Sequence, residues 1–337
     1  MILVTGGSGY LGAHLLYRLL KMDKEVRVLK RCGSRMALIN SVFASYEGNS
    51  SALIDKIEFV NGDLLDVISL MDAMEGVEEV YHCGAIVSFE PGNRSEMIKI
   101  NIDGTANVVN CALKAGVRKL CYVSSIAALG KGNDNEVITE DTHWKTSSYN
   151  SFYAISKYGG EREVWRGTEE GLDAVIVNPS IILGHSDPNG GTARLFHSVW
   201  NGLHIYPKGI NGFVDVGDVT DAMIKLMQSE IRNKRFVLSA CNKSYRDLFA
   251  AMAEAFNKKK PSIPASRALT SLAWRVEWVR SAVFGSRPLI TRETAMTSSQ
   301  EYVYSGERIT KTIDFKYTKF EDTIQRLAIE FEKEWSK

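Results

Sequence analysis

A tyrosine and a lysine stand four residues apart in the stretch FYAISKYGG, at Tyr153 and Lys157. If this stretch is helical, the two side chains lie on one face of the helix. A nearby ammonium stabilises a phenolate, so it lowers the pKa of a phenol from about 10 and prepares the group to give and take a proton. The same spacing is typical of a solvated helix face, so the interpretation depends on the elements that surround the pair.

A glycine-rich turn follows the first apolar run, in ILVTGGSGYLGAHLLYRLL. Gly6, Gly9 and Gly12 are spaced so that the first allows a tight turn, the second lets the backbone approach a pyrophosphate, and the third lets a helix pack closely on a strand. The helix that follows supplies unpaired N–H groups and the positive end of its dipole to the phosphates. The pattern predicts a strand–turn–helix unit that binds a dinucleotide.

The segment after the second apolar run, VRVLKRCGSR, bears on the choice of coenzyme. An acid here binds the 2′-hydroxyl of the adenosine ribose and repels a 2′-phosphate. The segment has no acid but contains Lys30, Arg31 and Arg35, which favours NADP(H), with NAD(H) still possible. Asp63, after the third run, is expected either to accept a hydrogen bond from the adenine or to cap a helix at 64–74.

Short β-branched runs alternate with helix-period stretches over the first 185 residues, which predicts an α/β fold with a doubly wound parallel sheet, a Rossmann domain. The predicted strands are Ile2–Thr5, Val26–Leu29, Ile57–Asn61, Val77–Cys83, Lys119–Ser124 and Ala174–Asn178. The predicted helices are Leu11–Leu20, Leu64–Met74, Met97–Ala115 and Tyr153–Arg166.

The rhythm changes after residue 185, and residues 186–337 are expected to form a smaller, mixed substrate-binding region over the carboxyl ends of the sheet. Strands from about 212–240 are expected to return to the first domain. The predicted elements are strands at Gly212–Val216 and Arg235–Leu238, and helices at Val219–Gln228, Tyr245–Phe256 with Ser244 as cap, Leu269–Val283 and Phe320–Glu332. Trp274 and Trp278 are expected to pack as one stripe of such a helix.

Composition narrows the class of partner. The 337 residues carry a formal net charge of +1, which argues against nucleic acid or a membrane surface as the main partner. The five cysteines are scattered, and neither they nor the histidines have the spacing of a metal site. No run of eighteen apolar residues occurs, and the first residues lack a basic leader. These features predict a soluble, unprocessed, cytoplasmic protein without a bound metal.

Seven motifs in one order give the chain a family resemblance. They are TGGSGYLG (5–12), GDLLD (62–66), YHCGA (81–85), NIDGTANVV (101–109), YVSSIAALG (122–130), YAISK (153–157) and NPSIILG (178–184). The chain resembles the extended short-chain dehydrogenase/reductases, or NAD(P)-dependent epimerase/dehydratase family, and within it the dihydroflavonol 4-reductase-like branch. The resemblance covers residues 1 to 240 most clearly, and a homodimer is a common assembly in this family.

The resemblance implies roles for individual residues. Tyr153 would be the general acid/base, and Lys157 would lower its pKa and hold the ribose of the nicotinamide. Ser125 would hydrogen-bond the substrate oxygen, with Ser124 as the alternative, and Asn101 would either support the site or begin a helix. From the motifs and the resemblance together, the residues expected to bind coenzyme are Gly6, Gly9, Tyr10, Leu11, Gly12, Arg31, Asp63, Leu64, Gly84, Ala85, Tyr153, Lys157, Pro179 and Ser180.

The reaction expected from this set is hydride transfer. The stretch SSIAALG lacks the acid pair that dehydratases of this family carry, which disfavours dehydration. Cations after the second strand suit a reductase that releases its oxidised coenzyme, so we expect an NADP(H)-dependent oxidoreductase that reduces a ketone or aldehyde of a partly apolar small molecule. The alternatives are a nucleotide-sugar epimerase, an NAD-dependent sugar or steroid dehydrogenase, and a non-catalytic dinucleotide sensor. His185 and Arg194 are candidates for contact with substrate, with packing and solvation as their competing interpretations.

Overall fold

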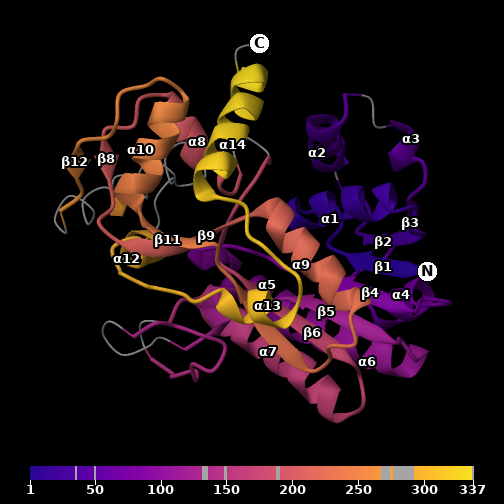
Figure 1. Cartoon of the computed structure of the whole chain (residues 1–337). Helices are drawn as coiled ribbons and strands as arrows, with labels where there is room; N and C mark the ends of the chain where they lie inside the picture. Colours follow the sequence, from indigo (N-terminus) through magenta and orange to yellow (C-terminus); the bar gives the residue numbers. More distant parts are fainter. Residues whose placement is uncertain are drawn as a thin grey trace.

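A seven-stranded parallel sheet forms the centre of the structure, a computed structural model that describes residues 1–34, 36–48, 51–130, 136–147, 150–186, 190–266, 274–275 and 292–335. Its strands are β1 (Ile2–Thr5), β2 (Val26–Lys30), β3 (Glu58–Asn61), β4 (Glu79–His82), β5 (Lys119–Val123), β6 (Ala174–Pro179) and β10 (Lys234–Leu238). They lie in the order β10-β6-β5-β4-β1-β2-β3, and all neighbours are parallel (Figure 1). The order reverses between β1 and β4, which is where open α/β sheets bind ligands.

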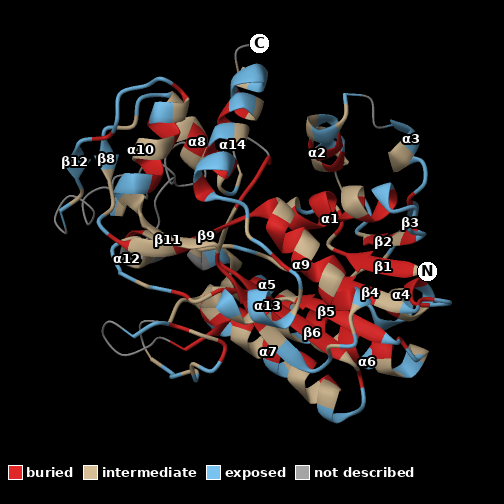
Figure 2. Cartoon of the chain, in the orientation of Figure 1, coloured by how far each residue is buried: buried red, intermediate tan, exposed pale blue. Residues whose placement is uncertain are grey.

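The strands form where the sequence offers short apolar runs. Every residue of β1 and β6 is buried, as expected of parallel strands covered on both faces (Figure 2). The six strands predicted in the first 185 residues are confirmed, with ends that differ by up to two residues.

Helices cover both faces of the sheet. One face carries α1 (Tyr10–Lys21), α2 (Ala37–Tyr46) and α9 (Val216–Gln228), and the other carries α4 (Val67–Ala73), α6 (Gly104–Ala115) and α7 (Phe152–Glu169). A short helix, α3 (Ser51–Ile54), precedes β3. The predicted doubly wound α/β class is confirmed.

The helix predicted at Met97–Ala115 is interrupted by a π turn. A short 3₁₀ turn, η1 (Pro91–Asn93), leads into α5 (Arg94–Ile98), which continues through the π turn η2 (Lys99–Asp103) into α6. A single π turn inside a helix often marks a functional site, because it adds one residue and redirects the side chains around it.

The helix predicted at 64–74 begins three residues later, at Val67. Asp66 is its cap, because the Asp66 carboxylate accepts from the backbone N–H of Ile68 at 3.1 Å. Asp63 instead accepts from the backbone N–H of Leu65 at 2.9 Å. The interpretation of Asp63 as the helix cap was therefore wrong.

A smaller lobe of helices and short strands lies beside the carboxyl ends of the sheet (Figure 1). It contains a three-stranded sheet of β7 (Ile181–Leu183), β9 (Ile210–Asp215) and β11 (Cys241–Ser244), and a two-stranded sheet of β8 (Ile205–Tyr206) and β12 (Ile263–Pro264). Its apolar core is formed mainly by α8 (Ala193–Trp200), α10 (Tyr245–Ala255) and α14 (Phe320–Trp335). The shorter helices α12 (Arg292–Thr297) and α13 (Glu307–Thr312) lie in the same stretch of chain.

Of the two later strands expected to return to the large sheet, β10 does so beside β6, whereas β9 pairs with β7 and β11. Ser244 caps α10 as predicted, since its hydroxyl accepts from the N–H of Asp247 at 3.1 Å. The helix predicted at 269–283, including Trp278, lies outside the described residues apart from 274–275. Within the described ranges, no helix combines the length and apolar character needed to span a bilayer.

Candidate active site

The glycine-rich turn after β1 brings two backbone segments into direct contact. Gly6 has φ +69°, and a Cβ placed on it would lie 2.6 Å from the Cα of Gly84, which follows β4. The N–H of Gly9 donates to the carbonyl of Gly6 at 2.9 Å, and a Cβ on Gly12 would overlap that same carbonyl. Only glycine fits at positions 6 and 12, and the result is a backbone cradle at the switch point of the sheet.

Helix α1 opens onto this cradle with its N–H groups unoccupied. Gly9 is its N-cap, no side chain caps it, and its first turn has no acidic residue. An anion is stabilised at such a helix end by the free N–H groups and the dipole. The cradle and the helix end together fit the pyrophosphate of a dinucleotide.

The other residues expected near the coenzyme divide into exposed and packed groups. Arg31 is exposed after β2, and Lys30 donates to the side-chain oxygen of Asn61 at 3.1 Å. Arg35 lies outside the described residues. Leu11 is buried, and Tyr10 packs edge-on against the ring of His14, with 5.5 Å between the ring centres.

Further residues expected near the coenzyme follow β4 and end β6, at the carboxyl edge of the sheet. Leu64 packs against Gly84, where an added Cβ would lie 3.0 Å from the Leu64 Cδ1, and Ala85 follows in the same loop. Pro179 ends β6, and the hydroxyl of the adjacent Ser180 is buried without a hydrogen-bond partner in the described part of the chain. An orphaned buried hydroxyl is costly, and a polar group of a bound ligand would satisfy it.

Two adjacent serines after β5 have different partners. Ser125 lies close enough to Tyr153 for its hydroxyl to lower the pKa of the phenol, and its Oγ accepts from the N–H of Ala127 at 3.1 Å to begin the short turn η3 (Ile126–Ala128). Ser124 instead donates to the buried carboxylate of Glu161 at 2.6 Å. Successive side chains of an extended segment point to opposite sides, so only Ser125 faces the tyrosine.

Lys157 is buried one turn after Tyr153 on α7. Its ammonium donates to the carbonyl of Val123 at 2.6 Å and to the hydroxyl of Tyr122 at 3.3 Å, and lies over the Tyr122 ring. Burial lowers the pKa of Lys157 to about 8, although the carboxylate of Glu161 acts in the opposite direction.

Burial raises the pKa of Tyr153, and the hydrogen bond with Ser125 offsets only part of this rise. The Lys157 ammonium, one turn along the same helix, is directed at the Val123 carbonyl. That Lys157 lowers the pKa of Tyr153 stays a prediction. The phenol is protonated at neutral pH and can donate a proton.

Asn101 lies in the π turn and connects three segments. Its side-chain amide donates to the carbonyl of Ile86 at 2.9 Å and to the hydroxyl of Ser156 at 3.0 Å, while its oxygen accepts from the N–H of Ile86 at 2.8 Å. It does not begin a helix. Asn101 therefore holds the loop after β4 against the helix that carries Tyr153 and Lys157, which is the supporting position that the resemblance implied.

His82 is a buried residue that the sequence reasoning did not place. Its Nδ1 lies 2.6 Å from the hydroxyl of Thr5, and its Nε2 lies 3.1 Å from that of Thr105. Because Thr105 donates to the carbonyl of Asn101, its oxygen must accept from Nε2–H, which assigns the tautomer. Burial lowers the pKa of His82 to about 3, so the ring is neutral and ties β1 and β4 to the π turn.

Glu161 was also missed, although its spacing of four residues after Lys157 places it on the same helix face. His185, considered as a substrate contact, is buried, hydrogen-bonded to Ser41 at 2.9 Å and stacked on Phe331 of α14. Arg194 is half-buried in the first turn of α8.

Comparison with known proteins now identifies the family. Residues 2–239 match the model of the NAD dependent epimerase/dehydratase family. The chain belongs to this family. It is similar to sterol demethylase protein B of Methylococcus capsulatus, with 32% identity over 244 residues that cover 70% of this chain and 69% of that one. It is also similar to a putative dihydroflavonol 4-reductase of Synechocystis, with 29% identity over 313 residues, 90% of this chain and 87% of that one.

Solved structures share the fold of this family member over nearly its whole length. The crystal structure of gox2253 has 28% sequence identity and a TM-score of 0.80, covering 99% of this chain and 98% of the other. The UDP-glucose 4-epimerase of Thermotoga maritima has 18% identity and a TM-score of 0.76, with 99% of both chains covered, which shows the fold alone. The resemblance to extended short-chain dehydrogenase/reductases is confirmed, and with it the prediction of an NAD(P)-dependent enzyme.

Proposed function

We propose that the protein is an NADP(H)-dependent oxidoreductase that reduces a ketone or aldehyde group of a partly apolar small molecule. The observation that carries this proposal is the position of Tyr153 on α7, one turn before the buried Lys157 and close enough to Ser125 for that hydroxyl to act on the pKa of the phenol, which burial raises. A protonated phenol beside a second hydroxyl is suited to donate to a carbonyl oxygen, on which negative charge grows as hydride arrives at the carbon.

The proposed mechanism divides the work among three side chains. The bound coenzyme supplies the hydride. Ser125 donates a hydrogen bond to the substrate oxygen, and Tyr153 donates the proton that converts the developing alkoxide into an alcohol. Lys157 holds the ribose hydroxyls of the nicotinamide and stabilises the phenolate left on Tyr153, which then takes a proton from solvent. Oxidation of an alcohol is the same sequence reversed.

Coenzyme binding is assigned to the cradle and to the cations after β2. Gly6, Gly9 and Gly12 with the start of α1 hold the pyrophosphate, and Asp63 accepts from the adenine. The exposed guanidinium of Arg31, with Lys30 beside it, pairs with the 2′-phosphate, which favours NADPH over NADH. Separate fluorescence titrations with NADPH and NADH test this choice, and tighter binding of NADH would overturn it.

The substrate is proposed to be an apolar carbonyl compound. The ring of Phe89 meets the Tyr153 ring edge-on at 5.6 Å, and Val87 in the same loop is largely exposed. An apolar approach to the phenol suits a ring system better than a sugar phosphate. Relatives named as a sterol demethylase protein, cinnamoyl-CoA reductases and 3β-hydroxysteroid dehydrogenases point to the same class of substrate.

A nucleotide-sugar epimerase is the second candidate. Ser125, Tyr153 and Lys157 would suffice for its chemistry, and several proteins of the same fold are epimerases. An epimerase retains its coenzyme through the cycle, whereas a reductase consumes it. Stoichiometric loss of NADPH absorbance with a carbonyl compound therefore separates the two functions.

The decisive experiment compares Tyr153→Phe with the wild type on a panel of aromatic, steroid and aliphatic ketones and aldehydes. Loss of a general acid costs about 10²- to 10⁴-fold in rate, so turnover at saturating NADPH should fall by this factor. Undiminished turnover in the variant would show that the proton comes from another group.

The cysteines and the family resemblance bear on the compartment and on the assembly of the protein. All five cysteines are free, as in a reducing compartment, which supports a cytoplasmic protein. A homodimer is proposed from the family resemblance, and sedimentation equilibrium tests it.

A further inference from the structure

Glu161 is a buried carboxylate on α7, one turn beyond Lys157, and four donors surround it. One oxygen accepts from the hydroxyl of Ser124 at 2.6 Å and from the amide of Asn178 at 2.8 Å. The other accepts from the guanidinium of Arg235 at 2.8 Å and from the indole N–H of Trp165 at 3.3 Å. A carboxylate offers about four lone-pair sites, so its accepting capacity is filled.

The donors come from different elements at one end of the sheet. Ser124 follows β5, Asn178 lies in β6, and Arg235 lies in β10. Asn178 also donates to the carbonyl of Ser125 at 3.0 Å. The carboxylate thus fixes the backbone of Ser125 from both sides, through its neighbour Ser124 and through Asn178.

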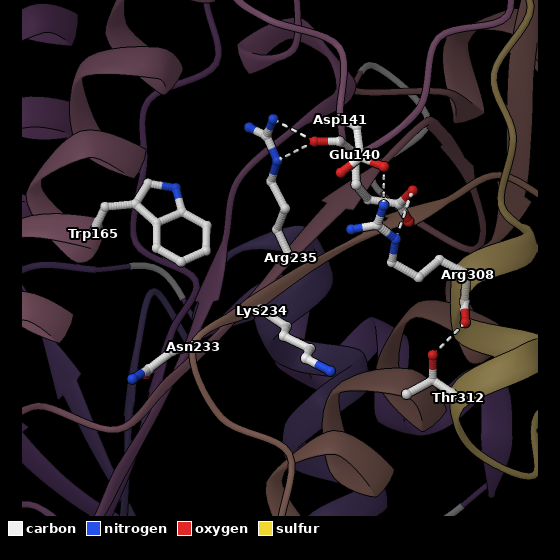
Figure 3. Close-up of a pocket in the computed structure, with 8 residues that line it drawn as sticks. All are labelled: Glu140, Asp141, Trp165, Asn233, Lys234, Arg235, Arg308 and Thr312. Atoms are coloured by element: carbon white, nitrogen blue, oxygen red, sulfur yellow. Dashed lines mark hydrogen bonds and ion pairs between the residues drawn. The ribbon is translucent and has the colours of Figure 1, made fainter.

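Arg235 connects this network to a hollow on the outer side of β10. Figure 3 shows the hollow, of about 470 Å³, with the Arg235 guanidinium directed at the carbonyl of Glu140. Its Nε donates to that carbonyl at 2.8 Å while a terminal nitrogen pairs with Glu161. The Arg235 guanidinium is therefore fixed by two partners. Its hydrogen bond to the Glu161 carboxylate comes from a side chain that is held in place.

Glu161 is also the anion that faces Lys157. The titratable groups around this lysine are His82 and Cys83 from β4 and its end, Tyr122 from β5, and Tyr153 and Glu161 from α7. Burial keeps the histidine neutral, and it raises the pKa of the Cys83 thiol to about 12. Glu161, four residues further along the same helix, raises the pKa of Lys157 and so opposes the loss of the lysine proton.

We propose that Glu161 is a positioning residue, whose carboxylate sets the orientation of Ser125 through Ser124 and Asn178 and places a buried negative charge one helical turn from the Lys157 side chain. The proposal rests on the proposed function in assigning Ser125 and Lys157 to catalysis. The carboxylate itself touches neither substrate nor coenzyme.

Glu161→Gln tests this role with little change in shape. Its amide group would face the donors of Arg235 or those of Ser124 and Asn178, so two hydrogen bonds are lost. Turnover should fall by about 10²-fold because small displacements of catalytic groups have effects of this size. The alkaline limb of the pH–rate profile should move to lower pH by about one unit, because an opposing charge near the ammonium has been removed.

Glu163→Gln is the matched control, because it is the same change on the same helix. Glu163 accepts from the Arg166 guanidinium at 2.9 Å on the partly exposed face of α7, away from the network. Its rate and pH profile should equal those of the wild type. An unmoved alkaline limb in Glu161→Gln, with turnover within threefold of wild type, would overturn the proposal.

A second variant covers the case in which Glu161→Gln fails to fold because Arg235 is left without its anion. Glu161→Gln/Arg235→Gln removes both charges and should fold, with the alkaline limb still displaced. Return of the limb to its wild-type position would show that Glu161 serves only to neutralise Arg235, and would overturn the proposal.

Direct titration of Lys157 separates this inference from the proposed function. In protein labelled with ¹³C at lysine Cε, the Lys157 resonance, assigned with Lys157→Arg, should titrate at lower pH in the double variant than in wild type. This readout needs no substrate, so it holds even if no carbonyl compound is reduced. Equal titration in both proteins would refute the electrostatic role whatever the activity.

Discussion

Replacing Gly160 by alanine tests whether the close approach of α7 to the π turn positions the catalytic side chains. A Cβ on Gly160 would lie 2.5 Å from the carbonyl oxygen of Asn101 and 2.5 Å from the hydroxyl of Tyr122. Contacts between a carbon and another heavy atom are favourable near 3.5 Å, so the helix and its neighbours must separate by about 1 Å. Neither neighbour can rotate away, because one is backbone and the other is a buried phenol that accepts from Lys157.

The two contributions to stability oppose each other. Alanine in place of glycine inside a helix is favourable by about 1 kcal/mol, whereas an extra methyl in a tightly packed contact costs about 1 to 3 kcal/mol. We expect a net loss of about 1 kcal/mol and a Tm lower by a few degrees. The effect on turnover should be larger, about 10²-fold, since a 1 Å displacement of α7 moves Tyr153 and Lys157 together.

Gly159→Ala is the control for Gly160→Ala. It brings the same gain in helix propensity, but the three atoms nearest to its Cβ all belong to the Ile102 side chain, of which the closest, Cδ1, is the movable end. Steady-state kinetics with NADPH and a reduced carbonyl compound, with thermal unfolding of each variant, measure both quantities. Equal kcat for Gly160→Ala and Gly159→Ala would refute the claim that this helix contact positions the site.

Three further outcomes follow from the described contacts. Ser125→Ala should lower kcat by about 10²- to 10³-fold, as for loss of one oxyanion donor. Ser124→Ala should lower the free energy of unfolding by about 1 to 3 kcal/mol and kcat by under about tenfold. A larger loss of kcat in Ser124→Ala than in Ser125→Ala would make Ser124 the catalytic serine. Arg31→Glu should weaken NADPH binding by about 10- to 100-fold in fluorescence titrations without weakening NADH binding, since an acid here can bind the ribose 2′-hydroxyl, and equal loss for both coenzymes would contradict the 2′-phosphate contact. The pKa values of His14 and His82 fall to about 4 and about 3 in the folded protein. Below pH 6.5 these histidines take up protons in the unfolded chain but not in the folded one, so the free energy of unfolding should fall by about 1.4 kcal/mol per histidine for each pH unit. A urea midpoint that does not fall between pH 7 and pH 5 would contradict this.

Local patterns in the sequence were enough for the fold and for most of the candidate site. Buried parallel strands read as short apolar runs, and their alternation with helices leaves one class of topology. Gly6, Gly9 and Gly12 are constrained by a single turn, and Tyr153 and Lys157 by a single helix. Each of these features depends on residues close in the chain, so spacing reveals it.

Contacts between distant segments were decided by the tertiary structure. The choice between Ser124 and Ser125 needed the partner of each, because neighbours in an extended segment point to opposite sides and α7 supplies both Glu161 and Tyr153. Asp63 and Asp66 are equally good caps by type, and only the start of α4 distinguishes them.

The direction of the pKa shifts was likewise a property of the folded chain. Sequence spacing placed Lys157 beside Tyr153, but β5 supplies the Val123 carbonyl that holds the ammonium, and burial raises the pKa of the phenol. The network of Glu161 draws donors from the end of β5, from β6 and from β10, and the β10 donor, Arg235, lies 74 residues from Glu161 in the chain. Spacing along a chain describes neighbours on one element, whereas desolvation and long-range hydrogen bonds exist only once the elements pack together.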